Sequence, residues 1–234
     1  MTGSSISFPS PLELGAGAPV ALIACGALGA SIREVVARRG WAVELHMLPA
    51  LLHNRPDLIA PSVERLARQI HSEGRLVVVA YADCGTYGAL DAVCERLQIG
   101  RLRGLHCYDV FAGADTMGDL FEEEPGTYVL TDFLVRSFRR TVLRELGLDR
   151  RPELWSDYFG HYRRLVWLAQ HRTAELETEA QAIAAQFGLR LSVLDLGVSA
   201  LETQLEDLLA AAGIETDGAR LSSNAARKLL CVAD

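Results

Sequence analysis

The sequence predicts an α/β fold: an open, mostly parallel, twisted sheet with helices on both faces, followed by a helix-rich C-terminal half. Continuous apolar runs such as Val20–Ala24 and Leu76–Tyr81 are typical of strands that are covered on both faces. Stretches with apolar residues at helical spacing, such as Leu28–Arg38 and Ala89–Leu97, alternate with these runs. This alternation predicts βαβ units, and right-handed crossovers then place helices on both faces of the sheet.

The N-terminal half contains the clearest expected elements. Gly40 ends the first helix, and the alternation of Val43, Leu45 and Met47 with polar residues predicts the second strand. The expected strands are Pro19–Cys25, Trp41–Leu48, Leu76–Cys84 and Arg101–Leu105, and the expected helices are Leu28–Arg38, Pro61–His71 and Ala89–Leu97.

The C-terminal half is predicted to be richer in helices. Its expected elements are a strand at Thr127–Leu130, helices at Phe133–Leu146, Thr173–Phe187 and Leu201–Ala212, and a last strand at Leu189–Leu194. Residues Pro152–Arg172 are rich in aromatics, and the run Trp155–Trp167 is expected to lie in the core or at an oligomer interface rather than to form a cofactor box. We expect one α/β domain over residues 18–212, a flexible tail at 1–17 and a peripheral segment at 213–234.

The composition limits the classes of partner. Half of the 234 residues are hydrophobic, which is enough for one sizeable core. The net charge is −7 and no basic stripe occurs, so neither nucleic acid nor an anionic membrane is an expected partner. A small molecule or a protein is the better expectation, and self-association into a homo-oligomer stays open.

The cysteine count of five is odd and the chain is long, which does not fit a disulfide framework. Residues 1–17 contain no Lys or Arg, so they do not resemble a signal peptide, and no apolar run reaches the length of a membrane span. We therefore expect a cytoplasmic protein with reduced thiols.

The most informative feature is a set of cysteines at expected strand ends. Cys25 and Cys84 close the first and third strands, and Cys107 comes at the end of the fourth. His53 falls in the loop after the second strand, and His106 adjoins Cys107. Because the carboxyl ends of parallel strands meet at one rim, these side chains are expected to converge. They predict a transition-metal site for zinc or iron, with thiolate ligands and either His53 or His106 completing the shell.

Other residues at the same turns are candidates for supporting roles. Gly26, Gly85 and Thr86 are small and would let a cofactor or ligand approach the backbone. Asp83 and Asp109 are candidates for catalytic proton transfer or for orienting an imidazole. Each has a purely structural alternative, and Asp83 in particular suits the cap of the following helix.

The other two cysteines give no evidence of a metal site, and several familiar motifs are absent. Cys94 lies within a helical pattern and Cys231 near the C-terminus, so both are expected to be structural. The chain contains no Cys-x-x-Cys, P-loop, G-x-S-x-G or H-E-x-x-H motif. These absences argue against zinc ribbons, nucleoside triphosphatases, esterases and zincins, and leave a dispersed site.

Several of these stretches resemble a known family, the domain of unknown function 1638. The resemblance is carried by Leu52–Pro56, Tyr81–Thr86, His106–Tyr108 with Phe111–Gly113, and Pro125–Phe133, and it extends from Leu22 to about Leu209. Tyr87 departs from the family pattern, in which we expect a glycine. The resemblance implies an association with corrinoid-dependent methyltransferases, and hence with one-carbon or methylamine metabolism.

Three hypotheses follow for the function. The first is a metal-binding protein with a Cys/His site at the carboxyl edge of the sheet. The second is an enzyme without metal, in which one cysteine of low pKa at a helix N-terminus is the nucleophile. The third is a non-catalytic accessory protein that binds a corrinoid or methyltransferase protein.

Overall fold

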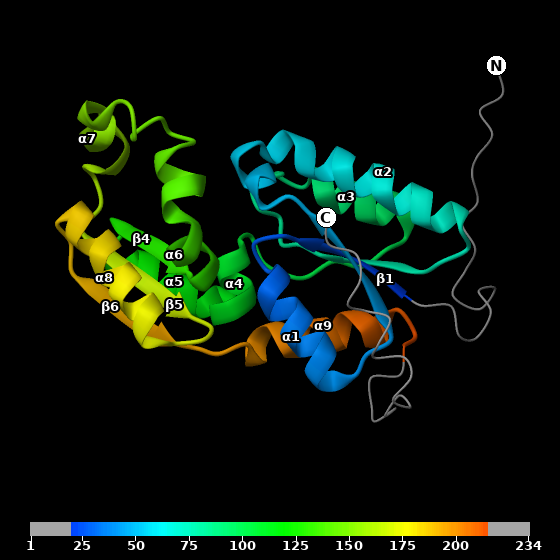
Figure 1. Cartoon of the computed structure of the whole chain (residues 1–234). Helices are drawn as coiled ribbons and strands as arrows, with labels where there is room; N and C mark the ends of the chain where they lie inside the picture. Colours follow the sequence, from blue (N-terminus) through cyan, green and yellow to red (C-terminus); the bar gives the residue numbers. More distant parts are fainter. Residues whose placement is uncertain (1–19, 215–234) are drawn as a thin grey trace, which may run out of the picture.

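The computed structural model describes residues 20–214, and this part of the chain contains two parallel three-stranded sheets, one beside the other (Figure 1). The expected tail at 1–17, Cys231 and nearly all of the segment 213–234 lie outside the described residues. None of the helices in this range is long and apolar enough to cross a bilayer.

The first sheet has the strand order β2-β1-β3. Its strands are β1 (Val20–Cys25), β2 (Val43–Leu48) and β3 (Val77–Ala80), and every residue of β1 and β3 is buried. Parallel pairing sets Cys25 opposite Leu48, and Ala24 opposite Ala80. The three strands therefore end at nearly the same level.

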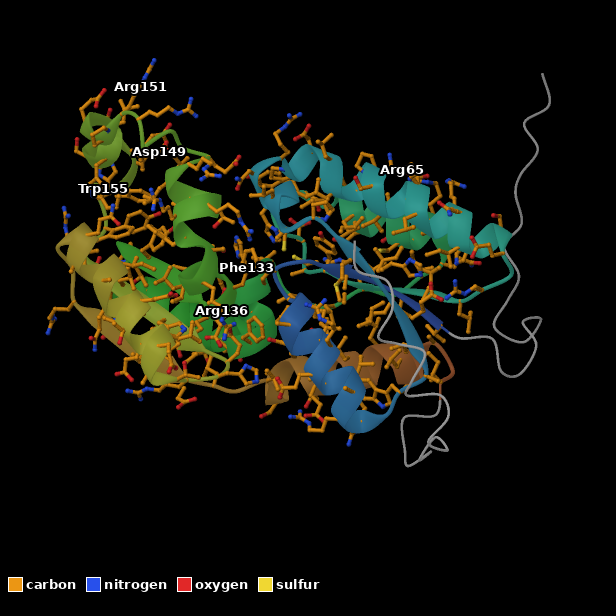
Figure 2. All side chains as sticks on the ribbon, viewed as in Figure 1. Arg65, Phe133, Arg136, Asp149, Arg151 and Trp155 are labelled. Carbon is orange, nitrogen blue, oxygen red and sulfur yellow. The ribbon has the colours of Figure 1, made fainter. Side chains whose placement is uncertain are left out.

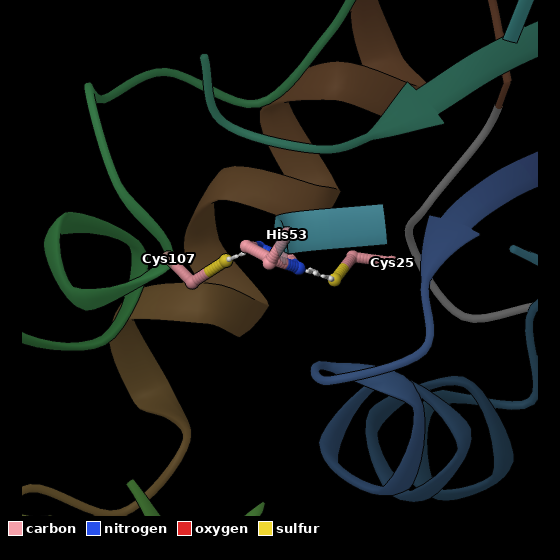
Figure 3. Close-up of side chains that lie close together, drawn as sticks. All are labelled: Cys25, His53 and Cys107. Atoms are coloured by element: carbon pink, nitrogen blue, oxygen red, sulfur yellow. Dashed lines mark hydrogen bonds between the residues drawn. The ribbon is translucent and has the colours of Figure 1, made fainter. Parts of the chain in front are cut away.

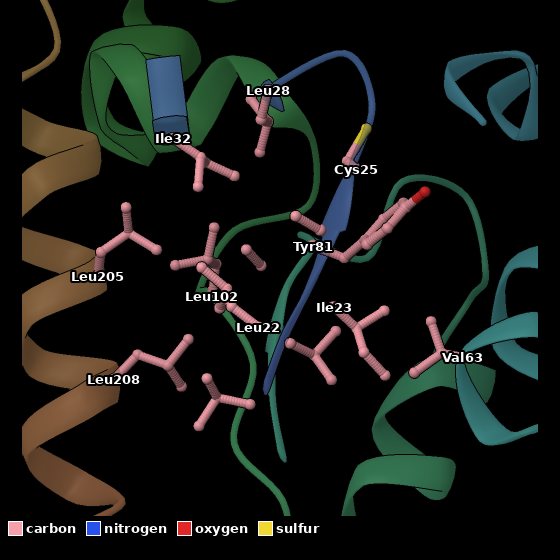
Figure 4. Packing of buried hydrophobic residues seen from close by; sticks show 14 of the residues in the cluster. Leu22, Ile23, Cys25, Leu28, Ile32, Val63, Tyr81, Leu102, Leu205 and Leu208 are labelled. Carbon is pink, nitrogen blue, oxygen red and sulfur yellow. The ribbon is translucent and has the colours of Figure 1, made fainter. Parts of the chain in front are cut away.

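Helices cover both faces of this sheet. Figure 1 shows α2 (Ile59–Ser72) and α3 (Ala89–Leu97) on one face, and α1 (Gly29–Arg39) and α9 (Ser199–Ala211) on the other. The α9 helix comes from the far end of the chain, yet its Leu205 and Leu208 pack in the same core as β1 (Figure 4). Val63 of α2 packs from the opposite side.

The second sheet has the order β4-β5-β6. Its strands are β4 (Thr127–Thr131), β5 (Arg164–Ala169) and β6 (Leu191–Asp195). The helices of this part are α4 (Cys107–Ala112), α5 (Ala114–Glu123), α6 (Asp132–Phe138), α7 (Trp155–Phe159) and α8 (Ala174–Phe187). The described residues also contain short 3-10 helices, η1 (Ala50–Asn54), η2 (Pro56–Leu58) and η4 (Pro152–Leu154). A short π-helix, η3 (Arg139–Leu143), follows α6.

The predicted α/β class, parallel pairing and helices on both faces are confirmed. The strands are divided between two sheets, each with its own buried apolar clusters. The assignment of residues 18–212 to one domain stays a prediction.

The predicted strand Arg101–Leu105 is wrong. Only Arg101 forms a bridge, with Val79, and the chain then bends through Gly104, whose φ is 115°. The segment still runs beside the end of β3, because Asp83 and Cys84 donate backbone hydrogen bonds to Gly104 and Leu105. Cys107 consequently begins α4 and does not close a strand.

In the C-terminal half one expected helix needs correction, and one strand was not predicted. The unpredicted strand is β5, a continuous apolar strand at the centre of the second sheet, which lies within the aromatic-rich residues Pro152–Arg172. The aromatic rings before it, including those of Phe159 and Tyr162, pack against Tyr128 in the core. The expected helix Phe133–Leu146 begins as α6 but changes to π-helical geometry at Arg139.

Gly26, directly after β1, is required by close packing of the backbone. A Cβ atom at this position would lie 2.7 Å from the Leu48 carbonyl oxygen and 3.0 Å from the Ala50 nitrogen. The Gly26 N–H donates to that same carbonyl at 2.9 Å. The glycine thus holds the end of β1 against the start of the loop that carries His53.

We expect Gly26→Ala to lower the free energy of unfolding by about 1–3 kcal/mol, because backbone atoms must move to admit the methyl group. Gly118→Ala is the matched control: it lies in α5 with open space around it, and should raise stability by about 0.5–1 kcal/mol. Urea unfolding measures both changes. Equal stability of the Gly26→Ala and natural chains would contradict the packing argument.

Candidate metal centre

Cysteine and histidine side chains from four separate segments meet at the carboxyl end of the first sheet. Cys25 is the last residue of β1, His53 lies in η1 after β2, and Cys84 follows β3. Cys107 is the first residue of α4. Figure 3 shows His53 between Cys25 and Cys107.

The distances in this cluster are short. His53 Nε2 lies 3.1 Å from Cys107 Sγ, and the two ring nitrogens lie 3.8 and 3.9 Å from Cys25 Sγ. Cys84 Sγ lies 3.3 Å from Cys107 Sγ. One ligand atom from each of Cys25, His53 and Cys107 lies within 4.8 Å of the other two.

His53 is held by its own loop and by a buried ring. Its Nδ1 lies 3.0 Å from the Ala50 carbonyl oxygen, within hydrogen-bond reach. Its ring stacks on Tyr81, with ring centroids 6.2 Å apart and 20° between the planes. A hydrogen bond at Nδ1 leaves Nε2 directed at Cys107, which is the arrangement that commonly orients a metal-binding imidazole.

Cys84 has an uncommon backbone conformation. Its φ is 51°, in the left-handed region that residues with a Cβ seldom occupy, at a cost of about 1–2 kcal/mol. Its N–H donates to the Leu105 carbonyl at 2.8 Å, which ties the turn to the segment before Cys107. This conformation directs the thiol toward Cys107.

The cluster carries charges of both signs. Burial lowers the pKa of His53, but hydrogen bonds and charge interactions with Cys25 and Cys84 outweigh it and raise the pKa to about 11. Hydrogen bonding to Cys107 is the main cause that lowers the pKa of Cys84 to about 6. Burial opposes ionisation of Cys25, yet hydrogen bonds from Cys107 and His53 bring its pKa well below 9.0.

Cys107 and Tyr81 keep their protons. Interactions with the Cys25 and Cys84 sulfurs, together with burial, raise the pKa of Cys107 well above 9.0. Burial and then the charge of Cys25 raise the pKa of Tyr81. The metal-free cluster therefore favours thiolates at Cys25 and Cys84 beside the imidazolium of His53.

The donor set and spacing fit a transition-metal ion. Tetrahedral bonds of about 2.0–2.3 Å to nitrogen and sulfur put neighbouring ligand atoms about 3.5–3.8 Å apart. The separations of 3.1 to 3.9 Å given above span this range. The four cysteines of the described range are unpaired by disulfides, so the three thiols of the cluster are free to coordinate.

Comparison with protein families connects this cluster to one of them. A model of proteins of unknown function, DUF1638, matches residues 47–205. The chain belongs to the DUF1638 family. The matched range contains His53, Cys84 and Cys107 of this DUF1638 protein, whereas Cys25 precedes it. No curated protein and no solved structure matches the chain.

The two candidate acids make hydrogen bonds to their own turns. Asp83 accepts from the Thr86 hydroxyl at 2.6 Å and from the N–H groups of Tyr87 and Gly88, which holds the turn before α3. These bonds outweigh its burial and lower its pKa. Asp109 accepts from Leu105 and His106 N–H at the start of α4. Both carboxylates therefore hold the turns that carry Cys84 and Cys107.

The small residues at these turns also make structural contacts. Gly26 allows the close approach of Leu48 described above, and Gly85 has a φ of 82°. Thr86 bonds to Asp83 and accepts from Leu90 N–H at the start of α3. Their part in binding a cofactor stays a prediction.

Of the two candidate histidines, the structure brings only His53 to the thiols. His106 is exposed and stacks against Tyr108, with the ring centroids 6.2 Å apart. Cys94 is buried within α3, where burial raises its pKa to about 11. Tyr81 is not among the residues predicted for the site, although a tyrosine directly after a wholly apolar strand is a usable signal.

We expect thiolate absorbance of the metal-free protein to show an ionisation near pH 6 from Cys84, and Cys25 to ionise well below pH 9.0. Removing the imidazolium by His53→Ala should raise both thiol pKa values toward 9.0, since a cation favours the thiolate. Absorbance at 240 nm against pH measures this.

Cys94→Ser is the control for this titration, because Cys94 lies outside the cluster and should leave the step near pH 6 unchanged. An unaltered titration in His53→Ala would show that the imidazolium does not stabilise the thiolates.

Proposed function

We propose that this DUF1638 protein binds one transition-metal ion through Cys25, His53 and Cys107, at the carboxyl edge of its first sheet. The observation that carries the proposal is that ligand atoms from three separate segments lie within 4.8 Å of one another. Burying charged or polar groups without a partner is costly, and a shared cation would compensate three such groups together.

Zinc or iron is the metal that this donor set favours. Two thiolates and one imidazole are soft or intermediate ligands, whereas magnesium and calcium prefer oxygen. Three protein ligands also leave a coordination position open, which is typical of catalytic zinc sites. A metal held there would supply a Lewis acid able to activate a thiol or a water molecule.

Cys84 is the residue best placed to use that position. Its thiol lies 3.3 Å from Cys107 Sγ but does not belong to the group of mutually close ligand atoms. We propose that Cys84 binds the metal as a fourth ligand, or leaves this coordination position to a substrate. Its conformation with a positive φ supports this second role, because such strain is frequent at functional sites.

The biological setting is proposed from the family resemblance. An association with corrinoid-dependent methyltransferases suggests one-carbon or methylamine metabolism, with a small-molecule substrate and a corrinoid or methyltransferase protein as partners. The reduced thiols suit the cytoplasm. The homo-oligomer and the purely accessory role remain alternatives within this setting.

A metal-free cysteine nucleophile is the second candidate, and one observation favours it. The Cys84 thiolate with a pKa of about 6 lies beside a protonated His53, as in cysteine enzymes that use a thiolate–imidazolium pair. Cys84 is also not wholly buried, with 7% of its surface exposed.

We expect protein purified without oxygen to carry about one zinc or iron ion per chain, measured by elemental analysis. Cys107→Ser removes a direct ligand and should weaken metal affinity by at least about 100-fold. Even the loss of a residue that only contacts a ligand can weaken metal affinity by up to about 100-fold. Cys94→Ser should retain the metal, because Cys94 lies within α3 and outside the cluster.

Alkylation separates the two candidates. With a metal bound, Cys25 and Cys107 should resist iodoacetamide until a chelator is added. A chain that carries no metal under any loading condition, yet has one rapidly alkylated thiol that Cys84→Ser abolishes, would overturn the metal proposal and favour the nucleophile.

A further inference from the structure

A cavity of about 310 Å³ lies where the ends of the two sheets approach each other. Its walls come from the turn after β1, from the start of α1, from α6 and from the residues after β5. Gly26 and Ala27 line one side, and Gln170 and His171 line the other. Figure 2 shows Phe133 and Arg136 of α6 near α1, where these walls meet.

Arginines dominate the charge of the cavity. Arg33 comes from α1, Arg136 from α6 and Arg140 from η3. Within residues 20–214 none of these three side chains makes an ion pair or hydrogen bond, while others such as Arg101 and Arg164 pair with carboxylates. All three side chains are exposed, so their guanidinium groups are open to a ligand that enters the cavity from solution.

The acid in the cavity wall does not neutralise these arginines. Asp132 accepts from Trp167 Nε1 at 2.9 Å, and from the N–H groups of Gln170 at 3.1 Å and His171 at 2.8 Å. Its oxygens are thus directed at the end of β5. His171, which also lines the cavity, contacts the Glu34 carboxylate of α1.

The start of α1 adds to the positive potential. Its first turn contains no acidic residue and its N-cap, Leu28, offers no side-chain acceptor. The Arg33 side chain folds back along the helix, since its Nη1 lies 3.5 Å from the position of a Cβ on Gly29. The guanidinium and the helix N-terminus therefore favour negative charge in the same place.

We propose that this cavity binds the phosphate or carboxylate group of a small anionic metabolite. Guanidinium groups form paired hydrogen bonds with both kinds of oxyanion, and the volume suits a small ligand. Gly26 and Ala27 directly follow Cys25, and the Ala27 N–H lies 3.3 Å from Cys25 Sγ.

Calorimetric titration of the full chain with inorganic phosphate, pyrophosphate and citrate tests the proposal, with glycerol as the uncharged comparison. At least one of the three anions should bind with a dissociation constant below about 1 mM. The double variant Arg136→Ala/Arg140→Ala should weaken binding by about tenfold or more, since each guanidinium contact with an anion is charge-assisted.

Arg139→Ala is the matched control, because Arg139 is an exposed neighbour of Arg140 that does not line the cavity. It should leave binding within about twofold. Arg136→Glu is a second test that reverses the charge, and it should abolish binding. Circular dichroism before each titration checks that the variants are folded.

No binding by any of the three anions, or an equal loss in Arg139→Ala, would overturn the proposal. Elemental analysis of the same samples keeps this test separate from the metal proposal. Anion binding by a chain that never takes up metal leaves the cavity assignment intact and removes the metal centre. Metal uptake without anion binding supports the metal centre and overturns the cavity assignment.

Discussion

The parallel alignment of β2 and β3 with β1 is the constraint on which the candidate site depends. Backbone hydrogen bonds fix the register, so that Cys25 stands opposite Leu48 and one residue beyond the Ala24–Ala80 pair. The loops that leave these strands must then begin at one edge. Burial of both faces holds this register, because a shift by one residue would exchange the sides on which the strand residues lie.

The turns that leave the sheet convert this alignment into a cluster of thiols. Gly26 lets the loop after β2 approach β1, and Asp83 and Asp109 hold the turns before α3 and α4. The segment before Cys107 is joined to Cys84 through its backbone. The carboxylates that resemble catalytic acids in the sequence therefore support the loops, and the thiols and the imidazole face one another.

Electrostatics within the cluster oppose the cost of burial. Thiolates at Cys25 and Cys84 are stabilised by the imidazolium of His53 and by the thiol of Cys107. Such a network keeps charged groups in a buried place with little water, and a bound cation would neutralise the same thiolates. The arginine-lined cavity adds positive charge at the turn after Cys25. Together they form one region with distinct anionic and cationic parts.

Much of this fold was predictable from local pattern. The apolar runs of β1 and β3 and the helical spacing of α1 and α3 are local properties, and so is the occurrence of Cys25 at a strand end. The prediction that Cys84 closes the third strand is wrong, because β3 ends at Ala80 and Cys84 lies in the turn that follows. The strand β5 escaped prediction, because aromatic residues before it obscured an otherwise clear apolar run. The bend at Gly104 escaped it as well, since only packing against Asp109 shows why that position turns.

The sequence by itself determined the α/β class, the parallel pairing and the identity of the thiols. Tertiary structure decided that His53 meets them and His106 does not, because His53 packs on Tyr81 while His106 faces outward from the N-terminus of α4. It also decided that two sheets form and that arginines from α1 and α6 share a cavity. The physical reason is that these contacts join residues distant in the chain, and local propensity carries no information about such pairs.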